Sequence, residues 1–126
     1  MDIKELIKSN NFDINNTSQF LSVIKEQGIE DINDYIIFSD KEDQEVFEET
    51  YKVLKDENTI DYDKRKYTLI AQTIDGDYIF SGLGNMYVVD ISLDKNIVEE
   101  YKQCTEIEFF EKYLNGEINS KILSTK

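Results

Sequence analysis

Three runs of alternating apolar and polar residues, separated by two glycine-containing turns, follow one another between residues 67 and 91. Asp75-Gly76 lies between two runs rich in β-branched and aromatic residues and suits the φ > 0 positions of a two-residue hairpin turn. Gly82-Leu83-Gly84-Asn85 supplies a second, looser reversal, because glycine and asparagine tolerate left-handed backbone. The pattern therefore predicts an antiparallel meander with strands at Tyr67–Thr73, Asp77–Ser81 and Met86–Ile91.

Alternation within these strands predicts which side chains share a face of the sheet. Tyr78 and Phe80 belong to one face and Ile79 to the other, and Met86 is opposed to Tyr87 in the same way. We expect one face to be core and the other to be partly wet. The aromatic residues are interpreted as core and cross-strand packing rather than as a stacking site for a ligand.

A helix is predicted directly after the sheet. Thr105 and Glu108 have the spacing of a capping box, and Asn115-Gly116 is a typical helix end. The apolar residues between them recur at helical spacing, at Ile107, Phe110 and Leu114. This pattern predicts a helix of about ten residues.

Two short helices are predicted before residue 30. The apolar positions of the first are Ile3, Leu6 and Ile7. After a polar break over residues 9–16, the second has Thr17 or Ser18 as its cap and ends near Gly28. Its apolar positions are Phe20, Leu21 and Ile24.

A third helix is predicted to begin after Ser39 or Asp40, where Ser39 and Glu42 have capping-box spacing. Its buried stripe is expected at Val46, Phe47, Tyr51 and Leu54. Its other face is acidic, and residues 58–66 form a charged connector without periodicity.

The length and composition fit one folded unit. A chain of 126 residues with 40% hydrophobic content can bury one core. The predicted fold class is α+β, with N-terminal helices, an antiparallel β-meander of at least three strands and a C-terminal helix packed as a single domain over residues 1–126.

The charge is strongly acidic and uneven. The chain has 27 acidic and 14 basic residues, which leaves −13. Such a charge repels nucleic acid backbones and attracts basic surfaces. Residues 40–63 hold ten acidic residues against three lysines, which leaves −7 of that total in this short segment. We therefore expect a basic protein partner and no nucleic acid partner.

The residues needed for common enzyme chemistry are missing. The chain has no histidine, and its one cysteine, Cys104, can form neither a Cys-His pair nor a thiolate metal cluster. Gly82-Leu83-Gly84 links two strands and so differs from a phosphate loop. Asp75 and Asp77 could form the carboxylate pair of a hydrolase, but in a hairpin turn such pairs are usually solvated. Residues 56–63 lack the glycine and terminal glutamate of a calcium loop. We expect no enzyme activity, no cofactor and no metal.

The N-terminus opens with the charged sequence Met1-Asp2-Ile3-Lys4-Glu5, and no apolar run reaches the roughly eighteen residues of a membrane span. One cysteine allows no internal disulfide, which agrees with a reducing compartment. We expect a cytoplasmic protein without membrane contact.

Three motifs together resemble the C-terminal half of the SUKH superfamily, which contains relatives of a fungal cell-wall-assembly regulator and many bacterial immunity proteins. They are Gly76-Asp77-Tyr78, then Met86-Tyr87-Val88-Val89-Asp90, and then a helix with Phe109, Phe110 and Leu114. The resemblance covers residues 67–114.

The N-terminal half departs from the SUKH pattern. Residues 32–38 resemble a family segment that opens a helix, but its proline is absent, and Ser39-Asp40 stands where the family has Asn-Gly. Two interpretations stay open: a divergent member of the family, or an unrelated α+β domain with similar strands.

The resemblance implies an immunity protein that binds and neutralises a cognate toxin, such as a nuclease or another enzyme with a basic active-site cleft. The alternative is an intracellular regulatory or scaffolding domain that docks another protein. The candidate partner-binding residues are Asp40, Glu42, Asp43, Glu45, Glu48, Glu49, Asp61, Tyr62 and Asp63, with Tyr62 as the candidate hot spot. An ordinary solvated acidic face is the competing interpretation of these residues, and the sequence leaves the oligomeric state open.

Overall fold

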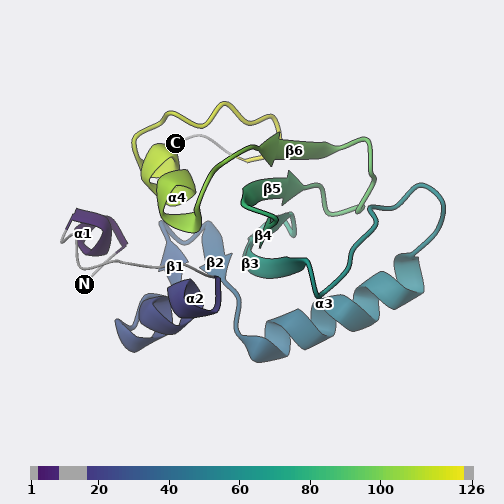
Figure 1. Ribbon diagram of the computed structural model, residues 1–126, viewed down its shortest axis with the longest axis horizontal. Coiled ribbons are helices and arrows are strands. Elements are labelled where there is room, and N and C mark those ends of the chain that lie inside the picture. The colour runs from purple at the N-terminus through teal and green to yellow at the C-terminus, as the bar shows by residue number, and fades with distance from the viewer. Residues whose placement is uncertain (1–2, 9–16, 124–126) are drawn as a thin grey trace.

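A computed structural model describes residues 3–8 and 17–123 of the chain (Figure 1). It contains both helices and an antiparallel sheet, so the predicted α+β class is confirmed. The elements in chain order are α1 (Ile3–Lys8), α2 (Thr17–Glu26), β1 (Asp31–Ile32), β2 (Ile36–Phe38), α3 (Lys41–Leu54), β3 (Tyr67–Thr73), β4 (Tyr78–Gly82), β5 (Asn85–Val89), β6 (Val98–Tyr101) and α4 (Glu106–Leu114).

The sheet is a six-stranded meander in the order β1-β2-β3-β4-β5-β6. The predicted strands appear as β3, β4 and β5, and Gly76 in the first turn has a φ of 95°, a backbone conformation that favours glycine. β5 ends two residues before the predicted Ile91. It ends there because the chain turns back at Asp90, whose carbonyl accepts a hydrogen bond from the Leu93 N–H at 2.8 Å.

The two faces of the sheet carry two separate cores. Side chains such as Ile79 and Met86 pack with α1, α2 and α4, which gather on one side in Figure 1. Tyr78 and Phe80 point to the opposite face, where Phe47 of α3 covers them. The predicted alternation is confirmed. The expected wet face is wrong for the centre of the sheet, because α3 buries it.

The strands β1, β2 and β6 were not predicted. β1 and β2 form a hairpin whose turn residues Asn33 and Asp34 have φ of 55° and 58°. This hairpin occupies the segment that the resemblance implies should open a helix. β6 has the polar sequence VEEY, and its residue Glu99 anchors the segment after α4 by accepting hydrogen bonds from the Ser120 hydroxyl and from the Lys121 N–H.

The C-terminal and N-terminal helices follow the predictions with one correction. α4 has the predicted capping box of Thr105 and Glu108. α2 already begins at Thr17, so both predicted caps, Thr17 and Ser18, lie inside the helix. The position before Thr17 and the predicted polar break over residues 9–16 lie outside the described residues.

α3 differs from its prediction at its start and along its buried side. The capping box is made by Asp40 and Asp43 rather than by Ser39 and Glu42, because the Ser39 N–H is already bonded to the carbonyl of Ile70 at 2.8 Å. Phe47 and Tyr51 are buried as predicted. The burial predicted for two further residues is wrong, since the exposed fractions are 60% for Val46 and 46% for Leu54.

Candidate functional site

The acidic residues at the start of α3 have a structural role of their own. Asp40 Oδ1 accepts a hydrogen bond from the Asp43 N–H at 2.8 Å, and Asp43 Oδ2 accepts one from the Asp40 N–H at 3.0 Å. The hydrogen bond from the Asp43 backbone is the main cause that lowers the pKa of Asp40. This reciprocal cap satisfies two backbone donors that a helix otherwise leaves unpaired.

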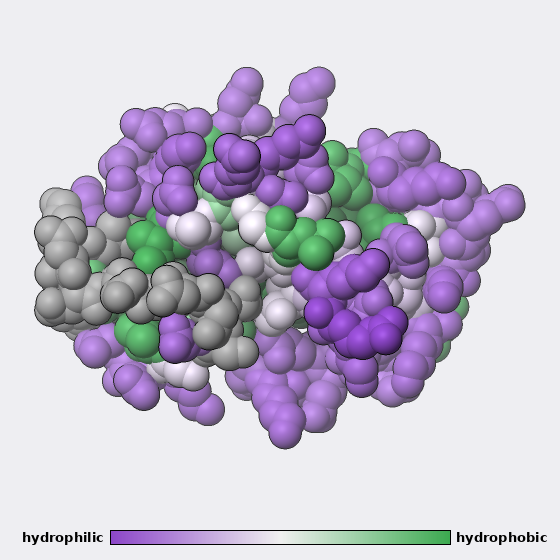
Figure 2. Space-filling view, viewed as in Figure 1, coloured by the Kyte–Doolittle hydropathy of each residue, from purple (hydrophilic) through white to green (hydrophobic). Residues whose placement is uncertain are grey.

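Further along α3, three of the predicted carboxylates are exposed to solvent: Glu42, Glu45 and Glu49. Within residues 3–8 and 17–123, three ion pairs are present, and the only one on α3 joins Lys52 Nζ to Glu49 Oε1 at 3.3 Å. In Figure 2, hydrophilic side chains cover the lower edge of the molecule, where α3 runs. Glu42, Glu45 and Glu49 together form the α3 acidic face.

Tyr62, the predicted hot spot, packs its ring into the core under α3. Its ring centroid lies 4.9 Å from that of Phe47 and 5.5 Å from that of Tyr51. Burial, followed by the charges of Glu48 and Asp63, raises the pKa of Tyr62 to about 12. The structure therefore packs the connector against the middle of α3 through the ring of Tyr62.

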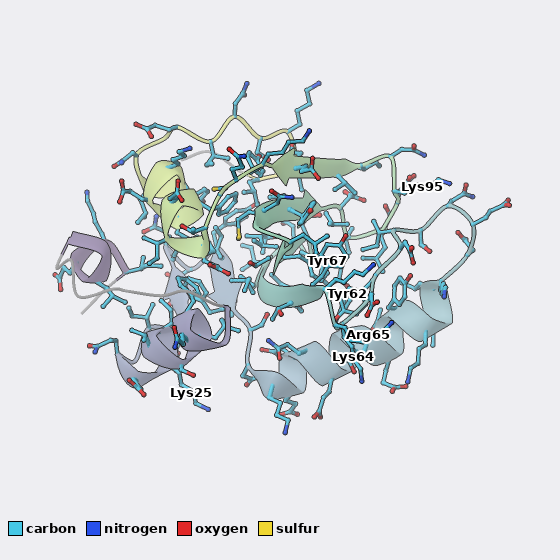
Figure 3. All side chains as sticks on the ribbon, in the orientation of Figure 1. Lys25, Tyr62, Lys64, Arg65, Tyr67 and Lys95 are labelled. Atoms are coloured by element: carbon cyan, nitrogen blue, oxygen red, sulfur yellow. The ribbon has the colours of Figure 1, made fainter. Side chains whose placement is uncertain are left out.

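Asp63 is held by an ion pair within the connector. Its two carboxylate oxygens accept hydrogen bonds from Arg65 Nε and Nη2, both at 3.1 Å. This pairing lowers the pKa of Asp63 and raises that of Arg65. Lys64 and Arg65 lie close together in Figure 3, next to Tyr62. The connector end of the predicted surface thus carries both signs of charge. Asp61, the remaining predicted residue of the connector, is exposed.

Two exposed valines on α3 were missed by the sequence reasoning. Val46 and Val53 have exposed fractions of 60% and 82%. A helical wheel could have identified them, because Val46 and Val53 are seven residues apart and thus share a flank of the helix that is turned away from Phe47 and Tyr51.

Asp75, Asp77 and Cys104, the other residues considered for chemistry, lie outside α3. The expectation that the carboxylates of the first turn are solvated is wrong for Asp77, which is buried and whose Oδ1 accepts a hydrogen bond from the Ile91 N–H at 3.0 Å. Asp75 is exposed in the turn, as expected. Cys104 is also buried, and burial raises the pKa of its thiol, which disfavours the reactive thiolate. In the part of the chain that the structure describes, no group of three or more His, Cys, Asp or Glu side chains is placed to hold a metal ion.

Among residues 3–8 and 17–123, no helix has both the length and the apolar character needed to cross a membrane. No protein-family model, no curated protein and no solved structure matches this chain.

Proposed function

We propose that this chain is an immunity protein that binds and neutralises a cognate bacterial toxin with a basic surface, such as a nuclease. The observation that carries the proposal is the α3 acidic face, whose exposed carboxylates take no part in the helix cap. The resemblance of residues 67–114 to SUKH immunity proteins supports the same function.

The charge distribution suits an inhibitor that must find its partner quickly. A net charge of −13 creates a negative potential that attracts a basic protein from a distance. Carboxylates on an exposed helix can then pair with the lysines and arginines that line a cleft built for a polyanionic substrate. Binding there would exclude the substrate by occupying the groups that recognise its phosphates.

The test is to measure binding and toxin inhibition with a charge-reversed variant. The tagged protein captures its partner from the native host, and the purified partner is assayed for toxicity and for inhibition by the chain. We expect the variant Glu42→Lys, Glu45→Lys, Glu49→Lys to associate at least about tenfold more slowly at low salt. Raising the salt should slow the wild-type association by a similar factor, because screening weakens steering.

A matched control reverses three exposed carboxylates away from α3. The control variant is Glu26→Lys, Glu30→Lys, Glu117→Lys. It has the same net charge as the α3 variant and should retain most of the wild-type association rate. Equal loss in both variants would show that only the total charge matters. A captured partner without toxicity would replace the immunity proposal by the regulatory or scaffolding alternative.

A further inference from the structure

The solvent side of α3 is divided into two flanks of different chemistry. Residues at spacings of four, three and four share a flank of an α-helix. One flank holds Lys41, Glu45, Glu48 and Lys52, which carry both signs of charge. The other flank, named the "valine stripe" here, holds Glu42, Val46, Glu49 and Val53. The valine stripe therefore contains carboxylates and apolar side chains and has no lysine of its own, although Lys52 of the other flank reaches Glu49 at 3.3 Å.

Folding does not account for the two valines of this stripe. With exposed fractions of 60% and 82%, Val46 and Val53 contribute little to either core. Valine is also a weak helix former, so alanine or glutamate would serve an exposed helix better. Single exposed apolar residues are common, but two that alternate with carboxylates on one stripe combine apolar and charged contacts, as contact surfaces do.

We propose that the valine stripe docks a helix of the partner whose apolar side chains lie between lysines or arginines. This inference rests on the proposed function and specifies which surface of α3 makes the contact. Val46 and Val53 would pack against the partner's apolar residues, and Glu42 would pair with a flanking cation. Glu49 would exchange its exposed contact with Lys52 for a contact with a second flanking cation. From Glu42 to Val53 the stripe is about 17 Å long, which about three helical turns of a partner can cover.

Charge favours a basic partner over a second copy of this chain. Two copies joined through their valine stripes would bring Glu42 and Glu49 of each chain against those of the other. Like charges at such distances destabilise an interface. Lys52 offsets part of the charge of Glu49, so this repulsion comes mainly from Glu42, which has no ion pair among the described residues.

The test uses three synthetic helical peptides as probes of the full chain. The first has leucines at the spacing of the stripe, flanked by lysines. The second replaces its leucines by serines, and the third replaces its lysines by glutamates. Titrations followed by methyl NMR should show saturable shifts centred on Val46 and Val53 for the first peptide alone.

Two variants make the assignment specific. Val46→Ser with Val53→Ser should weaken binding of the leucine-lysine peptide at least about tenfold, because two apolar contacts are lost. Ile74→Ser with Leu83→Ser is the matched control, since these residues are exposed by 67% and 63% on turns of the sheet and should leave binding unchanged.

The inference is overturned if the serine-lysine peptide binds equally well, if the shifts centre elsewhere, or if the double serine variant of the stripe binds as the wild type does. Concentration-dependent dimerisation lost in that variant would assign the stripe to a second copy and also overturn it. Failure of this inference can be distinguished from failure of the proposed function. Toxin inhibition unchanged by the stripe variant refutes the inference alone, whereas peptide binding without a toxic partner refutes the function alone.

Discussion

At the scale of single residues, Asp77 shows how a polar side chain organises the meander. Its carboxylate lies in the first hairpin, accepts a hydrogen bond from the Ile91 N–H at 3.0 Å and contacts the Thr73 hydroxyl. It thus joins the residue just before β4 to the segment that follows β5. Burial is the main cause that raises the pKa of Asp77 above its usual value of 3.8. The folded protein therefore binds the Asp77 proton more tightly than the unfolded chain does.

This pKa direction predicts a pH dependence. The contribution of Asp77 to stability is greatest below pH 3.8 and falls as the pH rises through its folded pKa. Asp77→Asn keeps an acceptor for the Ile91 N–H without the charge. Urea unfolding from pH 3.5 to 7 should show this variant gaining stability relative to the wild type as the pH rises, whereas Asp77→Ala should lose about 1–3 kcal/mol. A stability difference between Asp77→Asn and the wild type that stays constant with pH would contradict the raised pKa of Asp77.

Gly82 lies directly against the start of the neighbouring strand β3. A Cβ at this position would meet the Lys66 carbonyl oxygen at 2.4 Å and Tyr67 Cδ1 at 2.5 Å. Gly82→Ala should lower the free energy of unfolding by about 1–3 kcal/mol, because backbone must move. Gly116 has open space around its Cβ position and a φ of 73°, so Gly116→Ala should cost only about 1 kcal/mol. Thermal unfolding of both variants checks that Gly82→Ala is the more destabilising substitution.

At the scale of elements, α3 and the connector that follows it act as one unit. The Tyr51 hydroxyl donates a hydrogen bond to the Ile60 carbonyl at 2.8 Å and accepts one from the Tyr62 N–H at 3.0 Å. The connector is thus fixed to the helix by one side chain, and the ring of Tyr62 is placed over Phe80.

Tyr51→Phe should therefore loosen the connector. The variant leaves a half-buried carbonyl and N–H without their partner, which should cost about 1–3 kcal/mol. Hydrogen exchange of the Tyr62 amide should accelerate more than exchange within β4. Tyr87→Phe is the control, because the Tyr87 hydroxyl is bonded to the Asn85 side chain and its loss should cost less. Unchanged exchange at Tyr62 in Tyr51→Phe would contradict this role.

Elements with strong local signals could be predicted from the sequence, and those fixed by their neighbours could not. The Asp75-Gly76 turn and the Thr105 capping box identified β3, β4 and α4, since turn and cap chemistry acts within a few residues. β1 and β6 have two and four residues, too few to show a period, and they are strands because a neighbouring strand pairs with them. Val46 was misassigned because α3 contacts the sheet along a narrower stripe than the apolar pattern indicates.

For the candidate surface, too, the composition could be predicted from the sequence, but the pairing of its side chains could not. The acidity of residues 40–63 was visible in the sequence, but the sequence did not reveal that Asp40 and Asp43 cap the helix or that Arg65 holds Asp63. These pairings depend on backbone geometry. The absence of lysine from the four positions of the valine stripe follows from helical spacing alone, whereas the contact of Lys52 with Glu49 needed the structure.

At the scale of the whole molecule, the acidity that would attract a partner also acts on the fold. A net charge of −13 produces self-repulsion in the compact state. Only three ion pairs offset it among residues 3–8 and 17–123, and all are largely exposed on at least one partner.

Salt should therefore stabilise the isolated protein while it weakens binding. Raising sodium chloride from about 20 to 300 mM screens the repulsion and should raise Tm by a few degrees, roughly 1 kcal/mol for a chain of this size. Differential scanning calorimetry measures this directly. A fall in Tm would mean that attractive pairs outweigh repulsion, and it would contradict net self-repulsion in the folded protein.

The strand order bears on how quickly a newly made chain becomes active. Each strand pairs with its neighbour in sequence, so the sheet can assemble progressively as the chain leaves the ribosome. The longest segment between two paired strands is residues 39–66, which contains α3 and the connector. The chain contains no proline, so the slow isomerisation of prolyl bonds, which takes tens to hundreds of seconds, is absent from its maturation. Refolding after dilution from urea should be complete within about a second, as stopped-flow fluorescence would show. For a proposed antidote, such prompt maturation would shorten the time during which a freshly synthesised toxin is unopposed.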